Sequence, residues 1–207
     1  MQVKELYLGK PQNHTWEGQS ISTSIFRDSV QEIEIKDKKI LNCEQSDYKY
    51  HGGKFKEVYS FGLEDYAYWK KILGNEFESG SMGENITTVG LDESQLFVGD
   101  QLQFGEAILE VVQPRVPCLK LNIRLNRKDG IKLFLASKKY GVYYKVIKDG
   151  LIKIDSPITL LERDKSLPQI RLHELLPVLL GRNCSDELRE KILSLPETDP
   201  RLSKRLI

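Results

Sequence analysis

The sequence predicts a mainly β protein with helices, built as a β-barrel over residues 1–165 followed by a small domain of three helices over residues 166–207. Two observations carry this prediction. Many short apolar or alternating runs, separated by turn residues, follow one another as far as Leu161, which is typical of a barrel. After Glu162 the apolar period changes from two residues to the helical period, which marks a domain boundary near Lys165.

The strands of the predicted barrel are short. We expect them at Val3–Leu8, Ile21–Phe26, Val30–Ile35, Val58–Phe61, Gln101–Phe104, Ile108–Val112, Tyr140–Ile147, Leu151–Ile154 and Ile158–Leu161. Two of the turns between them predict hairpins, one at Lys36–Lys39 and one at Asp149-Gly150. The second is the stronger signal, because glycine tolerates the positive φ that a tight primed turn requires.

Two helices are expected to interrupt these strands. Leu63–Leu73 carries Trp69 and other apolar residues at helical spacing and stops at Gly74. Gly130–Lys138 carries its apolar residues, among them Phe134, on one face.

The C-terminal segment predicts three further helices. The first has leucines that follow the i, i+3, i+4, i+7, i+8 rule, and Pro177 within it should kink or weaken it. Ser185 is a suitable N-cap for the second helix. Asp199-Pro200 is typical of an N-cap and first helical residue, and opens a last short helix that runs through Leu206. Because about 40 residues provide little core of their own, we expect these helices to dock on the barrel or on a partner.

Composition excludes several classes of protein. The chain has 207 residues, 40% of them hydrophobic, and 31 basic against 30 acidic side chains. This balance disfavours binding to polymeric nucleic acid. The absence of a long apolar run and of a signal peptide argues against a membrane protein, so we expect a cytoplasmic location. Three cysteines without CxxC spacing argue against a disulfide framework and a structural zinc site.

The most informative segment is Gln113–Leu121, which places Cys118 after a Pro-x-x-Pro sequence and between Arg115 and Lys120. Two prolines limit the backbone, and the two cations favour a thiolate. Cys118 is therefore a candidate nucleophile or soft metal ligand. The alternative is a small buried hydrophobic residue that ends a strand.

Two glycine-containing segments are further candidates. His51-Gly52-Gly53-Lys54 places a titratable ring next to a flexible backbone and a cation, although on its own this motif favours a plain turn with a surface histidine. Gly80–Leu91 supplies glycines, a carboxylate, an amide and hydroxyls, as a site for a polar ligand would, but a structural loop is the alternative. The second segment lacks the phosphate-binding P-loop and dinucleotide-binding patterns.

Taken together, His51-Gly52-Gly53, Gly83–Thr88 with Gly90-Leu91, Gly99-Asp100 and Gln113–Leu121 resemble the MOSC domain proteins, specifically their YiiM-like branch. The resemblance implies a MOSC-type β-barrel that binds the molybdenum cofactor, a pyranopterin whose dithiolene holds molybdenum, with Cys118 as a ligand of the metal. It also implies reduction of N-hydroxylated compounds, such as hydroxylaminopurine bases or N-hydroxylated amines, with electrons from a separate reductase protein. The C-terminal segment resembles the three-helix domain of that branch.

The resemblance assigns roles to individual residues. The expected cofactor-binding residues are Arg27, His51, Gly52, Gly53, Lys54, Gly83, Glu84, Asn85, Arg115, Cys118 and Lys120. The expected catalytic residues are Cys118, His51 and Glu84, of which His51 is the better proton donor because imidazole titrates near neutral pH.

The chain departs from the family pattern at three positions. Cys43 stands where relatives have an aspartate, Arg27 where a lysine is usual, and Met82 where a phenylalanine is frequent. Arg27 keeps the positive charge but presents a planar fork, so we expect a phosphate contact of altered geometry.

Two other functions compete with the reductase. The protein could carry and deliver the molybdenum cofactor without reducing a substrate, using the C-terminal helices to dock on a client enzyme. Alternatively, Cys118 could serve as the nucleophile of a metal-free enzyme.

Overall fold

The computed structural model describes residues 1–47, 52–74 and 76–206, and its main element is an eight-stranded sheet. The strands of this sheet are β1 (Gln2–Gly9), β4 (Arg27–Val30), β7 (Val58–Gly62), β8 (Ile86–Val89), β9 (Gln101–Phe104), β10 (Ala107–Pro114), β11 (Val142–Lys148) and β13 (Ile158–Leu160). Their order is β13-β9-β10-β11-β7-β8-β1-β4. Neighbouring strands are antiparallel except β7 and β8, which are parallel.

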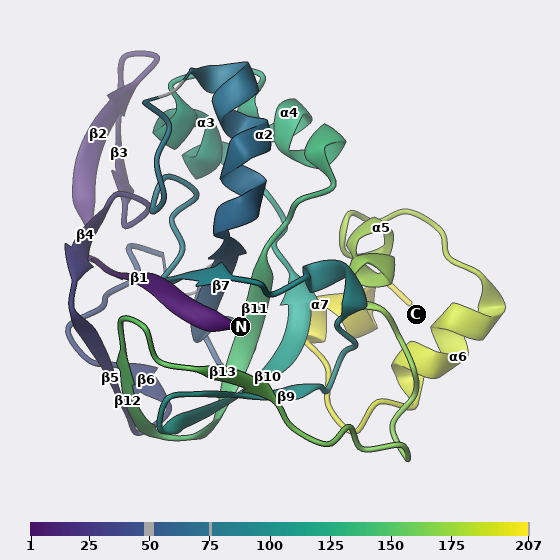
Figure 1. Cartoon of the computed structure of the whole chain (residues 1–207). Coiled ribbons are helices and arrows are strands. Elements are labelled where there is room, and N and C mark those ends of the chain that lie inside the picture. The colour runs from purple at the N-terminus through teal and green to yellow at the C-terminus, as the bar shows by residue number, and fades with distance from the viewer. Residues whose placement is uncertain (48–51, 75, 207) are drawn as a thin grey trace.

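The sheet curls until β1 lies next to the segment that precedes β13 (Figure 1). The N–H of Val3 in β1 donates to the carbonyl of Ser156, and the N–H of Asp155 donates to the carbonyl of Val3, each over 2.9 Å. A second sheet of β12 (Gly150–Lys153), β5 (Glu32–Lys36) and β6 (Lys39–Ile40) covers the remaining side. The predicted mainly β class with helices is therefore confirmed, and the strands enclose one barrel-shaped core.

The barrel core draws on both sheets. Leu6, Leu109 and Tyr144 of the large sheet pack with Ile33 and Ile152 of the small sheet, and each of these side chains is at most 1% exposed. The alternation of β5, in which Ile33 points inward between exposed glutamates, is the sequence pattern that predicted a half-buried strand. Removing each such side chain from water contributes about 1.5–3 kcal/mol.

Seven of the nine expected strands match observed strands to within two residues at each end, and the other two differ from the structure. Val30–Ile35 is divided at Gln31 into β4 and β5, which belong to different sheets. The strand expected at Ile21–Phe26 ends at Thr23, as β3 (Gln19–Thr23), and pairs with β2 (Gln12–Trp16) in a separate hairpin. Most residues of this hairpin are polar and exposed, so the hairpin has no apolar alternation by which sequence analysis could find it.

Of the two predicted hairpins, one is confirmed and one is wrong. Asp37 and Lys38 have φ values of 51° and 62° and form a two-residue turn between β5 and β6. At Asp149-Gly150, in contrast, the chain leaves the large sheet, and β12 pairs with β5 instead of β11. Gly150 is required there for space, because a Cβ atom at this position would lie 2.6 Å from the backbone carbon of Glu106.

Helices α2 (Leu63–Leu73), α3 (Leu119–Leu125) and α4 (Gly130–Ser137) gather at one end of the barrel (Figure 1). The first and third agree with prediction, whereas α3 was not predicted. Trp69 and Phe134, both fully buried, pack 6.2 Å apart between α2 and α4. A 3-10 turn at Glu93–Gln95 lies between β8 and β9. Within the described residues, no helix has the length and apolar character needed to cross a bilayer.

The C-terminal segment forms a 3-10 turn at Leu172–Glu174 and the helices α5 (Leu175–Leu179), α6 (Asp186–Leu193) and α7 (Pro200–Lys204). Pro177 lies in the first turn of α5, where its missing N–H leaves no hydrogen bond unmade. Ser185 and Asp199 cap α6 and α7 as predicted. Leu175 and Leu179 are buried in a cluster against which Val98 and Val116 of the barrel region also pack. The helices thus dock on the barrel, and the division into two domains stays a prediction.

Candidate functional site

A cavity of about 460 Å³, including its open mouth, lies where the loops at one end of the barrel meet α3. We call it the cation-lined cavity. Its lining comes from six parts of the chain, namely Thr23, Ser24, Ile25 and Arg27 around the start of β4, Gln45 and Ser46 after β6, Lys56 and Tyr59 at β7, Gly83 and Asn85 before β8, Arg115, Cys118 and Lys120 around the start of α3, and Tyr143 of β11.

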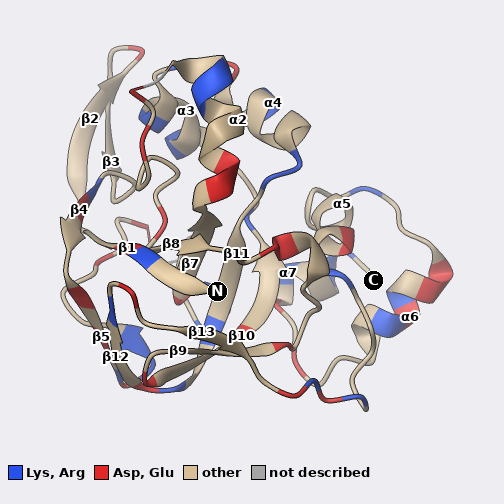
Figure 2. Cartoon of the chain, viewed as in Figure 1, with Lys and Arg blue, Asp and Glu red and all other residues tan. Residues whose placement is uncertain are grey.

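Four cationic side chains line this cavity, and no aspartate or glutamate is among its described lining residues. The cations are Arg27, Lys56, Arg115 and Lys120. Figure 2 shows that charges of both signs are otherwise spread along the whole chain, in keeping with a net charge of +1. The concentration of positive charge is therefore local, and it favours an anionic ligand at this place.

Arg115 is held in place by its surroundings. Its Nη1 donates to the carbonyl of Met82, and its guanidinium lies over the rings of Tyr59 and Phe134, with centroid distances of 5.1 and 5.8 Å. Burial lowers the pKa of Arg115, but its neighbours, Tyr59 first among them, raise the pKa by more, so that it lies above its usual value. Arg115 is thus a permanent, nearly buried cation with a 6% exposed fraction.

Lys56 is the second nearly buried cation of the cavity, with a 9% exposed fraction. Burial and then the charge of Arg201 lower its pKa to about 8, against the opposite effects of Asp199 and Cys118. Arg201 and Asp199 belong to the C-terminal segment, which therefore acts electrostatically on the site.

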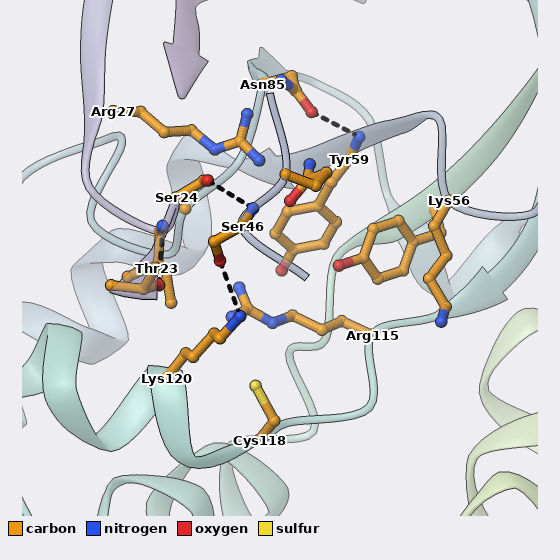
Figure 3. Close-up of a pocket in the computed structure, with 14 residues that line it drawn as sticks. Thr23, Ser24, Arg27, Ser46, Lys56, Tyr59, Asn85, Arg115, Cys118 and Lys120 are labelled. Carbon is orange, nitrogen blue, oxygen red and sulfur yellow. Dashed lines mark hydrogen bonds between the residues drawn. The ribbon is translucent and has the colours of Figure 1, made fainter. Parts of the chain in front are cut away.

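Cys118 precedes the first residue of α3, where its backbone is extended. β10 ends at Pro114, so Cys118 does not end a strand, and that alternative interpretation is wrong. The side chain is half-buried and points toward Arg115 and Lys120 (Figure 3). Lys120 in turn donates from Nζ to Ser46 Oγ over 2.9 Å. The structure thus places the thiol beside the two cations that the sequence singled out.

The loop before β8 contributes backbone and one amide to the cavity. Gly83 has a φ of 72°, and a Cβ atom there would lie 2.6 Å from the side chain of Ile25. Asn85 accepts a hydrogen bond from the N–H of Tyr59 over 3.2 Å and donates to the carbonyl of Tyr7 over 3.4 Å. The buried amide of Asn85 therefore links β7 to β1 at the wall of the cavity.

Glu84 lies away from the cavity and is fully buried. Its Oε1 accepts hydrogen bonds from Tyr66 Oη at 2.6 Å, the N–H of Gly80 at 2.8 Å and Thr87 Oγ1 at 2.9 Å. This carboxylate fixes the conformation of the glycine-rich loop from the side that faces the protein interior. The catalytic role expected for Glu84 has no support in this position.

The remaining predicted site residues lie elsewhere or outside the described part of the chain. Gly52 and Gly53 line a neighbouring cavity of about 830 Å³, which shares Lys56 with the cation-lined cavity. Lys54 points to the C-terminal segment, where its Nζ lies 2.7 Å from Glu197. His51 lies outside the described residues, so its proton-donor role stays a prediction.

Sequence analysis missed several residues that line the cavity. Lys56, Tyr59, Tyr143 and Ser46 are examples. The two lysines of Gly-Gly-Lys-Phe-Lys gave no usable signal for Lys56, because alternation directs Lys54 and Lys56 to the same side of an extended chain only if no turn intervenes. A turn does intervene at Gly53, which has a φ of 92°, and the N–H of Lys56 donates to the carbonyl of Gly53.

The donor set restricts how a metal could be held. Across residues 1–47, 52–74 and 76–206, no group of three His, Cys, Asp or Glu side chains converges on one point. A metal next to Cys118 would therefore need most of its ligands from a cofactor. One soft sulfur ligand, surrounded by cations suited to an anion, fits the anionic pterin dithiolene of the molybdenum cofactor.

The family follows from comparison with known proteins. The sequence model of the MOSC domain matches residues 47–159, which include most of the cavity lining. The chain belongs to the MOSC domain family. The MOSC chain is also 33% identical to protein YiiM of Escherichia coli over 154 residues, which cover 73% of this chain and 67% of that protein.

Two further similarities extend this result. The crystal structure of YiiM from Geobacillus stearothermophilus superposes on this MOSC protein with a TM-score of 0.78 and 26% identity, covering 100% of this chain and 99% of that one. A protein of Gibberella moniliformis named reductase is 31% identical over 153 residues, which cover 72% of this chain and 27% of that protein. The chain is thus a YiiM-like MOSC protein, as the sequence motifs predicted.

Proposed function

We propose that this MOSC protein is a molybdenum-cofactor-dependent reductase of N-hydroxylated compounds, in which the Cys118 thiolate is a ligand of molybdenum. The observation that carries the proposal is the position of Cys118, which is half-buried in a cavity lined by four cations. None of the described residues that line this cavity is an aspartate or a glutamate. The similarity to YiiM and to a protein named reductase supports the reaction class.

The chain's own residues would bind the cofactor in distinct ways. Cys118 offers the soft donor that molybdenum prefers, and Arg27, Arg115 and Lys120 offer charge-assisted hydrogen bonds to the phosphate of the pterin. The buried Nε of Arg27 has no partner among the described residues, so an added acceptor there would recover a lost hydrogen bond. Gly83 keeps the wall of the cavity closely packed, because a Cβ at this position would lie 2.6 Å from the side chain of Ile25.

The overall reaction would be R–NH–OH + 2 electrons + 2 protons → R–NH2 + water. The bound cofactor supplies the two-electron chemistry at molybdenum, and a separate reductase protein would supply the electrons. The protons must come from solvent or from side chains at the cavity, and His51 is the residue proposed for this role.

The competing carrier function loses its main argument in this structure. It required an apolar stripe on the C-terminal helices that is free to dock on a client enzyme. Leu175, Leu176, Val178 and Leu179 are instead at most 5% exposed, packed inside the chain. The reductase is therefore the better-supported proposal.

The test is the molybdenum content per chain, measured by elemental analysis after anaerobic purification from a host that synthesises the cofactor. We expect near-stoichiometric metal in the wild type and little in Cys118→Ala, with Cys184→Ala as the matched control because Cys184 lies in the C-terminal segment. Wild-type protein should then reduce an N-hydroxylated aminopurine with reduced methyl viologen as electron donor. Wild-type levels of metal in Cys118→Ala would overturn the ligand assignment, and metal-loaded protein without this activity would overturn the reductase.

A further inference from the structure

A second cavity adjoins Cys118. It measures about 580 Å³ and is lined by Lys56, Gln113, Val116, Pro117, Cys118, Tyr143 and Arg201. We call it the Gln113 cavity. Lys56, Cys118 and Tyr143 line both this cavity and the cation-lined cavity, so the two spaces share one wall that includes the thiol. A ligand in the Gln113 cavity would therefore lie next to whatever Cys118 binds.

Gln113 is an unusual lining residue because its side-chain oxygen is buried and has no hydrogen-bond partner among the described residues. The exposed fraction of the residue is 1%, and the oxygen concerned is Oε1. It lies near the end of β10, where the pairing with β11 shifts register between Val111 and Gln113. A buried amide oxygen without a partner costs about 1–3 kcal/mol, which a ligand that donates a hydrogen bond to it recovers.

The chemistry of a carboxamide defines that ligand. A carboxamide has an acceptor oxygen next to an N–H donor, and it pairs in two hydrogen bonds with an edge that places an N–H beside a ring nitrogen, as adenine does. The other lining groups, the Tyr143 ring and the apolar Val116 and Pro117, suit a flat ring.

Arg201 brings the C-terminal segment into this cavity. Asp199, which caps α7 and is 6% exposed, accepts hydrogen bonds from Arg201 Nη2 at 2.8 Å and from its Nε at 3.2 Å. A guanidinium has five N–H donors, so the contact with Asp199 fixes its plane and leaves donors for a ligand. The last helix thereby becomes part of a binding site that is otherwise formed by the barrel.

We infer that the Gln113 cavity is the substrate pocket for a flat N-hydroxylated heteroaromatic compound with an amidine-type edge, which Gln113 pairs with and Arg201 of α7 holds at the rim. This inference rests on the proposed function, and it makes Gln113 the residue that distinguishes such substrates from aliphatic hydroxylamines, which have no ring nitrogen beside the N–H.

The first test compares Gln113→Met, which keeps the volume but loses the amide, with Gln103→Met, which changes an exposed glutamine of β9. Using molybdenum-loaded protein, we expect Gln113→Met to raise the KM for an N-hydroxylated aminopurine about 10-fold, which corresponds to about 1.4 kcal/mol. The KM for N-benzylhydroxylamine should rise by less than the KM for the aminopurine, because this substrate has no ring nitrogen for Gln113 to pair with, and the molybdenum content should match that of the wild type. An unchanged KM for the aminopurine substrate would overturn the assignment of Gln113.

The second test does not depend on turnover. Equilibrium dialysis with adenine, which carries the same edge without the hydroxyl group, should show binding to the wild type and to Gln103→Met, and weaker binding to Gln113→Met. If adenine binding depends on Gln113 but no N-hydroxylated compound is reduced, the pocket stands and the reductase fails. If reduction proceeds and neither KM nor adenine binding depends on Gln113, the reductase stands and the pocket is overturned.

A separate variant tests the role of α7. Arg201→Lys keeps a positive charge opposite Asp199 but loses the planar fork. We expect a several-fold increase in the KM for the aminopurine substrate, whereas Arg189→Lys, on the exposed face of α6, should have no effect. An unchanged KM in Arg201→Lys would remove the C-terminal segment from the site.

Discussion

Arg27 donates a hydrogen bond from its Nη1 to the Sγ of Cys43 over 3.4 Å. The resemblance to the MOSC domain proteins marks these two positions as departures, with an arginine where we expect a lysine and a cysteine where we expect an aspartate. The N–H of Gly9 and the Nδ2 of Asn85 also point to this sulfur, at 3.5 and 3.6 Å. The two departures are thus in contact, which indicates that each accommodates the other.

We therefore predict that Arg27→Lys and Cys43→Asp are coupled. The double variant recreates an ion pair, whereas each single variant mismatches the length or the charge of its partner. We would measure this in a double-mutant cycle by chemical denaturation. The unfolding free energy of the double variant should be about 0.5–3 kcal/mol higher than the value obtained by adding the effects of the two single variants.

The control for this cycle pairs Arg27→Lys with Cys184→Ser, two changes on different parts of the chain. These should add within about 0.5 kcal/mol. Equal additivity in the Arg27 and Cys43 cycle would mean that the contact between these side chains carries no energetic weight.

Glu84 should be a stability residue. Glu84→Ala leaves the Tyr66 hydroxyl, the Gly80 N–H and the Thr87 hydroxyl without their shared acceptor in a buried place. Hydrogen bonds to charged groups contribute about 1.5–3 kcal/mol each, so we expect a loss of at least about 3 kcal/mol of unfolding free energy. For a chain of this length that lowers Tm by about 6–12 °C, which calorimetry would measure.

The matched control for Glu84 is Glu64→Ala in the first turn of α2. Its exposed carboxylate accepts one hydrogen bond, from the N–H of Gly90 at 2.7 Å. We expect a loss below about 1 kcal/mol there. If Glu84→Ala kept the wild-type Tm but lost reductase activity, the catalytic role expected from the sequence would be restored.

The sequence predicted those parts of the fold that depend on local pattern. Helix α2 has the predicted bounds, and the Asp37-Lys38 turn and the Asp199-Pro200 start of α7 are in place, because spacing, turn chemistry and capping are all local. The Asp149-Gly150 prediction failed because β12 is paired by distant β5, which no local signal reveals.

The site was predicted only as far as its motifs extend. Cys118, Arg115 and Lys120 come together because they share one short segment of the chain. Lys56, Tyr143 and Arg201 were missed because they come to Cys118 from three distant parts of the chain, namely the loop before β7, strand β11 and helix α7. Conversely, the Gly-Glu-Asn motif gave no hint that its glutamate faces the interior while its glycine and asparagine face the cavity.

Lys120 should contribute to cofactor retention. Its Nζ donates to Ser46 Oγ, which holds the positive charge of Lys120 at the cavity wall. We expect Lys120→Met to weaken binding of the molybdenum cofactor about 10-fold, since a hydrogen bond to a charged group contributes about 1.5 kcal/mol or more. The measurement is cofactor occupancy after extended dialysis.

Lys128→Met is the control for Lys120, because Lys128 has an 81% exposed side chain and pairs with Glu17 at the surface. Its occupancy should match the wild type. Occupancy in Lys120→Met that equals this control would exclude Lys120 from the cofactor site.

Asp199 should make the stability of the C-terminal segment depend on pH. Burial raises the pKa of Asp199, but hydrogen bonds from the side chain and backbone of Arg201 lower the pKa by more, so that it lies below its usual value. A carboxyl with a lowered folded-state pKa stabilises the protein above its unfolded pKa of about 3.9, and this contribution disappears as the pH falls through the folded-state pKa. Asp199→Asn should therefore lower the unfolding free energy at pH 7 by about 1–3 kcal/mol.

This difference between the wild type and Asp199→Asn should stay constant from about pH 7 to about pH 5 and shrink below about pH 4, as linkage requires. Denaturation curves at several pH values measure it, with Asp28→Asn as the control because Asp28 is exposed in β4. A difference that is independent of pH would mean that the wild-type contribution comes from the shape of the cap and not from its charge. In that case Arg201 would be held in the Gln113 cavity by packing, and the asparagine variant should keep the wild-type KM for the aminopurine substrate.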